Sequence, residues 1–155
     1  GTRMRAPNRI PKLFKRGVNV TLGLDVSKAA SWGDQAHMAY LLARDQGDHL
    51  SPDDLLHMQT ANAARAMGWD SWLGSLEAGK RADIVIRSND RPETWPRHNR
   101  ERQHLLLARG KSVDTVIVDG EIVIKEGRHV RLDEGALYAR CDRAAKTLRE
   151  RAGVA

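Results

Sequence analysis

The sequence has one cysteine, few aromatic residues and no long apolar run. The single Cys141 excludes an internal disulfide framework and is typical of a cytoplasmic protein, which is the location we expect. In its helical pattern this residue is expected to be small, apolar and buried. No run approaches the ~18 apolar residues of a membrane span, so no membrane contact is predicted. The first residues lack the apolar stretch of a signal peptide, and a start at Gly1 indicates a processed chain or a fragment.

The charge is basic, with a formal net charge of +6 over 155 residues. That excess raises nucleic-acid binding as one function class. Beyond a group of basic residues near the start of the chain, the basic residues are interspersed with 20 acidic ones, and no nucleic-acid-binding motif is present. A solvated basic surface is therefore favoured, and a basic α/β module for nucleic acid or a protein partner remains the alternative. The early basic residues are Arg3, Arg5, Arg9, Lys12, Lys15 and Arg16.

The first half of the chain follows the helix–strand order of an α/β protein. Residues 7–16 have apolar residues at helical spacing, and Gly17 is expected to end that helix. Residues 18–24 alternate β-branched or leucine residues with smaller or polar ones and predict a short buried strand. Asp25 follows the carboxyl end of this strand, which is where α/β barrels hold their chemistry.

Two helices are predicted next. One covers residues 32–45 and buries a face of alanines. The other begins after Ser51, a good N-cap, and continues to Ala66. Its inward face contains Asn62, which needs a hydrogen-bond partner if it is buried. The full inward face is Leu55, Met58, Asn62 and Ala66.

The second half is rich in strand patterns. Strands are predicted at 82–86, 113–118 and 121–125, with a surface loop at 88–103. The Asp119–Gly120 pair between the last two predicts a hairpin with a type I′ turn. The apolar run 105–107 is compatible with a strand or a helix. A final amphipathic helix, 133–151, is expected to pack on its own protein.

No catalytic motif is evident from residue spacing alone. The six histidines form no compact metal-ligand pattern, and the chain has neither a phosphate loop nor a nucleophile elbow. By the same criterion, Asp25 is expected to cap or turn the backbone. No substrate-binding residue is identified.

Four phrases carry a family resemblance: 17–25 (GVNVTLGLD), 61–68 (ANAARAMG), 73–85 (LGSLEAGKRADIV) and 113–120 (VDTVIVDG). Their order and wording resemble the C-terminal part of the metal-dependent amidohydrolase superfamily. The branch resembled holds cytosine, guanine and adenosyl-type deaminases and the triazine chlorohydrolases. The glycine-rich phrase at 73–85 is the most specific of the four.

The resemblance implies a fold: α/β, with the C-terminal part of a (β/α)8 TIM-type barrel, strands of a small flanking β-sandwich and a C-terminal helix. Residues 1–69 would be the last βα units of the barrel, with 18–24 as its eighth strand. Residues 70–132 would supply sandwich strands, which the N-terminal part of such enzymes completes. Residues 133–155 would be the terminal helix.

The resemblance also implies a function. Asp25 would be both a metal ligand and a catalytic residue in hydrolytic deamination, or a related displacement, on a heterocyclic or amidine-like carbon. The cofactor would be one divalent ion, zinc or alternatively iron, and the substrate a small molecule. Here Leu24 and Val26 flank the aspartate where the family usually has threonine before it and serine or glycine after it.

The family's histidine ligands are absent from this chain, and one carboxylate does not hold a catalytic metal. We therefore expect the chain alone to bind no catalytic metal and to be inactive without the N-terminal part of the same protein. Unpaired sheet edges would also favour a homo-oligomer or aggregate.

Overall fold

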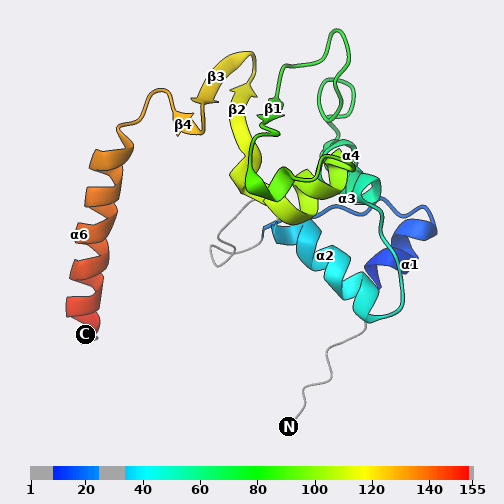
Figure 1. Ribbon diagram of the computed structural model, residues 1–155, viewed down its shortest axis with the longest axis horizontal. Helices are drawn as coiled ribbons and strands as arrows, with labels where there is room; N and C mark the ends of the chain where they lie inside the picture. Colours follow the sequence, from blue (N-terminus) through cyan, green and yellow to red (C-terminus); the bar gives the residue numbers. More distant parts are fainter. Residues whose placement is uncertain (1–8, 25–33, 154–155) are drawn as a thin grey trace.

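The computed structural model describes residues 9–24 and 34–153. A helical part forms around the first half of the chain, a small antiparallel sheet follows, and a long helix ends it (Figure 1). This mixture of helices and one small sheet agrees with the predicted α/β class.

In the first half, the described residues form four helices: α1 (Ile10–Lys15), α2 (Asp34–Asp45), α3 (Pro52–Gln59) and α4 (Ala61–Ala66). The start of α3 confirms the predicted N-cap. The Ser51 side chain accepts from the backbone N–H of Asp54, and the Asp54 carboxylate accepts from the backbone N–H of Ser51. This reciprocal capping box satisfies two donors that a helix start otherwise leaves unpaired.

The prediction of one continuous helix from 52 to 66 is wrong. Thr60 has φ −124° and ψ −94°, outside the helical region, and it separates α3 from α4. Its hydroxyl donates to the carbonyl of Leu56 at 2.8 Å, a local bond by which threonine competes with the helix ladder. Ala66, predicted to face inward, is exposed.

The core is small and aliphatic, as predicted. It joins α2, α3 and a later helix, η2 (Gln103–Ala108). Partly buried side chains of α1 and of the segment 18–24 pack against this core. Its buried members are Ala36, Ala39, Ala43, Leu50, Leu55, Met58, Leu105 and Leu106.

The sheet is an antiparallel meander of β1 (Ile84–Arg87), β2 (Val113–Val118), β3 (Glu121–Lys125) and β4 (Arg128–His129), in that order. Asp119 and Gly120 both have positive φ, 50° and 83°, which confirms the predicted type I′ turn. A second turn of the same kind, Glu126–Gly127 with φ 52° and 73°, leads into β4. The sequence reading missed this short strand.

Between β1 and β2 the chain is more helical than predicted. The loop prediction for 88–103 misses η1 (Pro92–Thr94) and the helical turn α5 (Arg100–Arg102). The apolar run 105–107, for which the sequence allowed a strand or a helix, lies in the π-helix η2. Another short turn, η3 (Arg109–Ser112), leads into β2.

No β-strand forms at 18–24, contrary to prediction. Its backbone bonds to helices join the Val18 N–H to the carbonyl of Leu13 in α1 at 3.1 Å and the Leu22 N–H to the carbonyl of Met58 near the end of α3 at 3.2 Å. A strand requires a neighbouring strand, and the four strands of the described residues all lie in the meander at 84–129. The alternation in the sequence is that of a strand, whereas the ladder partners are not among the residues described.

The last helix, α6 (Glu134–Ala152), begins at the predicted place with the Asp133 side chain as its cap. None of its residues is buried, and it stands apart from the helical part (Figure 1). The prediction that it packs on its own protein is therefore wrong for the residues described here. For the same reason Cys141 is exposed, not buried.

Candidate functional site

The predicted site residue Asp25 lies outside the described residues, which stop at Leu24 and resume at Asp34. The structure does describe how the chain approaches that position. Val20 and Leu22 pack against the core, so the segment leading to Asp25 is held on its apolar side.

A pair of asparagines holds the same segment on its polar side. The Asn62 side-chain amide donates to the carbonyl of Val20 at 3.1 Å. In return, the Asn19 amide donates to the carbonyl of Asn62 at 3.0 Å. Asn62 is buried at 9% exposure, so the partner that its burial required is the backbone of the segment 18–24. The sequence predicted that Asn62 needs a hydrogen-bond partner but did not identify the carbonyl of Val20 as that partner.

An ion pair marks the point where the described chain resumes. Asp34, the first residue of α2, accepts from the guanidinium of Arg109 at 2.8 Å. Arg109 follows η2 and has a positive φ of 49°. Residues 75 positions apart in sequence are thereby joined.

Among residues 9–24 and 34–153, no group of three or more histidine, cysteine, aspartate or glutamate side chains is placed to hold a metal ion. A catalytic zinc uses three protein ligands, and a carboxylate is one of the accepted kinds. Asp25 therefore fits as one member of such a set. A complete set of three ligands would need further residues, and the described residues offer no such group.

Two histidines of the described chain, His57 and His129, make local contacts, whereas the buried Nδ1 of His37 has no hydrogen-bond partner. The His57 ring lies 2.9 Å from the carbonyl of Asp53 on its own helix. The His129 ring accepts from the backbone N–H groups of Arg131 and Leu132. Both contacts fit the packing or surface roles predicted from their spacing.

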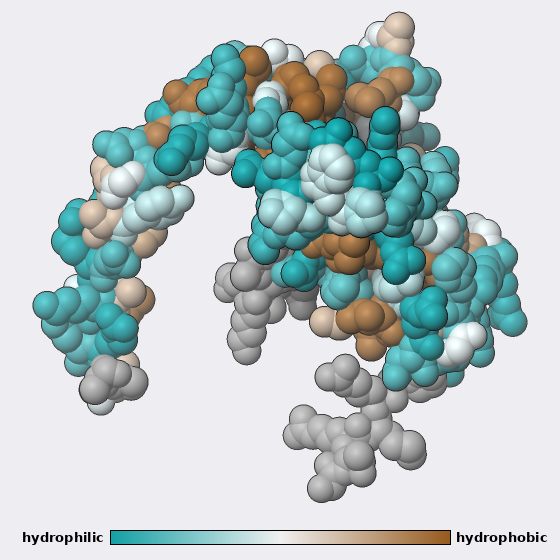
Figure 2. Space-filling view, in the orientation of Figure 1, coloured by the Kyte–Doolittle hydropathy of each residue, from teal (hydrophilic) through white to brown (hydrophobic). Residues whose placement is uncertain are grey.

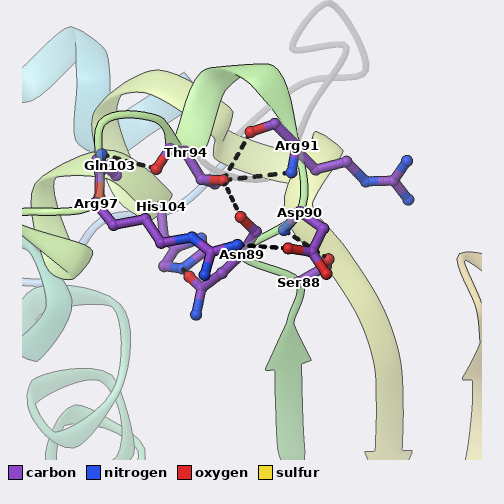
Figure 3. A network of polar contacts seen from close by, with 8 residues as sticks. All are labelled: Ser88, Asn89, Asp90, Arg91, Thr94, Arg97, Gln103 and His104. Carbon is purple, nitrogen blue, oxygen red and sulfur yellow. Dashed lines mark hydrogen bonds and ion pairs between the residues drawn. The ribbon is translucent and has the colours of Figure 1, made fainter.

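A second polar cluster lies between β1 and η2 (Figure 3). Its centre is the buried Thr94, whose hydroxyl oxygen lies 2.6 Å from the carbonyl of Asn89 and 2.7 Å from that of Arg91. The Gln103 amide donates to the carbonyls of Thr94 and Pro96. Because these partners all fall within the segment 88–104, the cluster braces that segment.

His104 extends the cluster toward η3. Its Nε2 lies 2.9 Å from Oδ1 of Asn89, and its Nδ1 lies 3.0 Å from the hydroxyl of Ser112. The amide oxygen only accepts, so Nε2 carries the proton and Nδ1 accepts from the serine. Burial lowers the pKa of His104, and the nearby guanidinium of Arg87 lowers it further. A neutral imidazole suits both hydrogen bonds.

Arg87 completes this cluster from β1. Its guanidinium donates to the Ser112 hydroxyl at 3.0 Å and to the carbonyl of Arg109. Burial lowers the pKa of Arg87 as well. These residues form the His104 cluster (Arg87, Asn89, His104 and Ser112), whose hydrogen bonds join β1, η2 and η3.

Comparison with known proteins identifies the class. The Amidohydrolase family profile matches residues 6–123, and the chain belongs to that family. The resemblance inferred from the four sequence phrases is therefore confirmed.

No helix of the described residues is long and apolar enough to cross a membrane.

The relatives are deaminases and hydrolases. A 5-methylthioadenosine/S-adenosylhomocysteine deaminase of Thermoanaerobacter pseudethanolicus is 32% identical over 148 residues, which is 92% of this chain and 34% of that protein. A 5'-deoxyadenosine deaminase of Methanothermobacter thermautotrophicus is 35% identical over 145 residues, 90% of this chain and 34% of the relative. The chain thus spans about a third of the length of the curated relatives it matches.

A solved structure confirms the fold class. The zinc-bound crystal structure of an adenosine deaminase from Xanthomonas campestris superposes with a TM-score of 0.83 at 26% identity, covering 91% of this chain and 34% of that one. A triazine hydrolase variant superposes with a TM-score of 0.74 at 24% identity, covering 84% of this chain and 30% of that one. The chain matches the C-terminal part of amidohydrolase TIM-barrel structures.

Proposed function

We propose that this chain is the C-terminal part of a metal-dependent hydrolase that acts on a C–N bond of a small heterocyclic substrate. The observation that supports this most directly is the family match across residues 6–123. Relatives named for the deamination of adenosine derivatives support an adenine nucleoside as substrate and hydrolytic deamination as the reaction. The non-enzymatic basic module is disfavoured because the family match covers most of the chain.

The proposed division of the chain follows from the same family. Residues 1–69 would complete the barrel, 70–132 would supply sandwich strands, and 133–155 would be the terminal helix. The meander of β1–β4, which lies within residues 84–129, supports a separate sheet unit after residue 70, although η2 from the same stretch packs into the core of α2 and α3. The N-terminal part of the protein would supply the remaining strands of both units.

Asp25 is proposed as the residue of this chain that acts in the reaction. The zinc seen in the adenosine deaminase structure supports a divalent ion in the whole enzyme, where it would supply a water molecule ionised near neutral pH. The Asp25 carboxylate would coordinate that ion, accept the proton of the attacking water and return it to the leaving amine. The segment 18–24, which leads to Asp25, is held by both hydrogen bonds and apolar packing, and this supports the proposed role.

Replacing this carboxylate in the complete enzyme tests the proposal. Asp25→Asn keeps the size of the side chain but removes its charge and its basicity, so turnover is expected to fall about 10²- to 10⁴-fold. Deamination measured by ammonia release and zinc content after dialysis would check this. Asp142→Asn, on the exposed helix α6, is the matched control and should leave turnover unchanged. Near-normal turnover in Asp25→Asn would falsify the assigned role.

A further inference from the structure

The two asparagines that hold the segment 18–24 are the feature with most bearing on the proposed site. We infer that Asn62, together with Asn19, is a positioning residue that fixes the carboxyl end of this segment and thereby the placement of Asp25. The inference rests on the proposed function, because it assigns Asn62 a purpose only if Asp25 acts in the reaction.

The geometry of the contact is specific to one alignment of the segment. Asn62 donates to Val20 at 3.1 Å, and the carbonyl of the same asparagine accepts from Asn19 at 3.0 Å. Two bonds that run in opposite directions between the same two stretches of chain fix both position and direction. A shift of the segment by one residue would break both bonds and would turn Val20 and Leu22 away from the core.

A third bond depends on the break between α3 and α4. In a continuous helix the carbonyl of Met58 would accept from the backbone N–H of Asn62. Because Thr60 interrupts the ladder, this carbonyl is available to Leu22, whose N–H donates to it at 3.2 Å. The break therefore places a backbone acceptor against the segment two residues before Leu24.

Packing alone does not account for this arrangement. Val20 and Leu22 already bury apolar surface against the core, and an apolar residue in place of Asn62 would serve that purpose as well. A buried amide costs free energy unless it is hydrogen-bonded. The Asn62 amide meets this need by donating to the carbonyl of Val20, in the backbone that leads to Asp25. Groups hydrogen-bonded to a metal ligand orient it and so affect metal affinity and activity, and Asn62 is inferred to act on Asp25 less directly, through the backbone that leads to it.

The test uses the complete enzyme with three variants. Asn62→Ala removes the buried donor. Asn19→Ala removes the reciprocal bond at an exposed position, where the cost to folding is expected to be small. Thr94→Ala is the matched control, because it also removes a buried polar group with backbone partners but lies in the braced segment 88–104. Melting temperature, zinc retained against a chelator, and kcat and KM are measured for each variant.

Asn62→Ala is expected to reduce both zinc affinity and kcat by about 10-fold or more, with KM close to that of the parent. Asn19→Ala should change both quantities in the same direction by a smaller factor. Thr94→Ala should lower the melting temperature and leave zinc affinity and kcat unchanged. The inference is overturned if Asn62→Ala and Asn19→Ala retain zinc and kcat as fully as Thr94→Ala does.

The Asp25→Asn variant separates the two possible failures. If it remains active, the role assigned to Asp25 is wrong and the positioning role falls with it, whereas a complete parent enzyme that releases no ammonia from adenine nucleosides would contradict the proposed function. If Asp25→Asn is inactive while both asparagine variants behave like the control, the function stands and the positioning role is wrong.

Discussion

At the scale of single residues, the polar side chains of this chain mostly bind backbone. Asn62, Thr94 and Gln103 each direct a side-chain donor at a carbonyl of a segment without regular strand structure. Such segments cannot satisfy their own carbonyls, so side chains from helices and turns do it for them. This is why buried amides and hydroxyls gather where strands are missing.

The residue-scale chemistry was only partly predictable. The sequence showed that Asn62 needed a partner, since a polar residue on an apolar helix face is informative by itself. It did not show which carbonyl, because that depends on the break at Thr60 and on a contact 42 residues away in sequence. The His104 cluster was not predicted, since its members come from separate elements and follow no spacing rule.

His104 gives a prediction about protonation. In this chain its imidazole should titrate below the ordinary value of ~6.5, because burial and the Arg87 guanidinium both favour the neutral form. Arg87→Met keeps an apolar stem but removes the charge, so the pKa should rise toward the ordinary value. NMR titration of the ring protons would measure both midpoints.

Arg102→Met is the control, because this exposed arginine does not act on the imidazole. A midpoint in Arg87→Met at or below that of the parent would contradict the electrostatic cause. The lowered pKa of His104 also makes the stability of the fold depend on pH. Because the folded pKa is lowered, the unfolded chain binds the proton more tightly, and the free energy of unfolding contributed by His104 declines as pH falls below ~6.5.

At the scale of elements, caps and tight turns were predicted well. The box at Ser51, the stop at Gly17 and the hairpin at Asp119–Gly120 each depend on residues within four positions of one another. The missing strand at 18–24 and the unpacked helix α6 depend instead on partners far away in sequence or outside the described chain. Local chemistry fixes where an element begins and ends, whereas its neighbours decide whether it pairs or packs.

The glycine-rich phrase at 73–85 has a packing reason that the sequence did not reveal. A Cβ at Gly74 would lie 2.5 Å from the Cβ of Ala64 and 3.2 Å from the Cα of Ala61. The turn is therefore pressed against α4, the helix that carries Asn62. Gly74 also has a φ of 93°, which side chains other than glycine rarely adopt.

Substitution at this turn should be costly. Gly74→Ala adds a clash with backbone and with a short, rigid side chain, so we expect a loss of about 1–3 kcal/mol beyond the backbone strain. Gly79→Ala is a close control, since Gly79 has a φ of 91° and nothing within 4 Å of the added Cβ. Denaturant unfolding of the two variants isolates the packing contribution. Equal destabilisation would show that the close approach to α4 has no energetic weight.

At the scale of the whole molecule, this chain leaves much apolar surface uncovered. Apolar side chains gather over β1–β3 on the face shown in Figure 2. Those exposed on the sheet are Val85, Ile86, Val118 and Ile122. The strand β1 is also an edge of the meander, so its outer backbone groups have no neighbouring strand among the described residues. In the proposed enzyme, the N-terminal part would cover this surface.

Without that part, the chain should self-associate. An apolar edge strand offers backbone pairing to a second copy, so sedimentation of the isolated chain should show species larger than a monomer. Val85→Lys places a charge on the edge and should shift the population toward monomer. Val130→Lys is the control, since Val130 is similarly exposed at 47% against 52% but lies outside the strands. An isolated chain that stays monomeric at high concentration would contradict this.

The meander also sets an order in which the chain can fold. Two-residue turns join β2 to β3 and β3 to β4, so closing these hairpins costs little chain entropy. By contrast, Arg87 pairs with Val113 only after the whole segment 88–112 has been gathered between them. During synthesis β1 therefore leaves the ribosome before β2 but is completed late. In that interval the apolar residues of β1 are exposed. The hydrogen bonds of Thr94 and Gln103 make the segment 88–104 compact, so β1 and β2 have a shorter distance to cover before they pair.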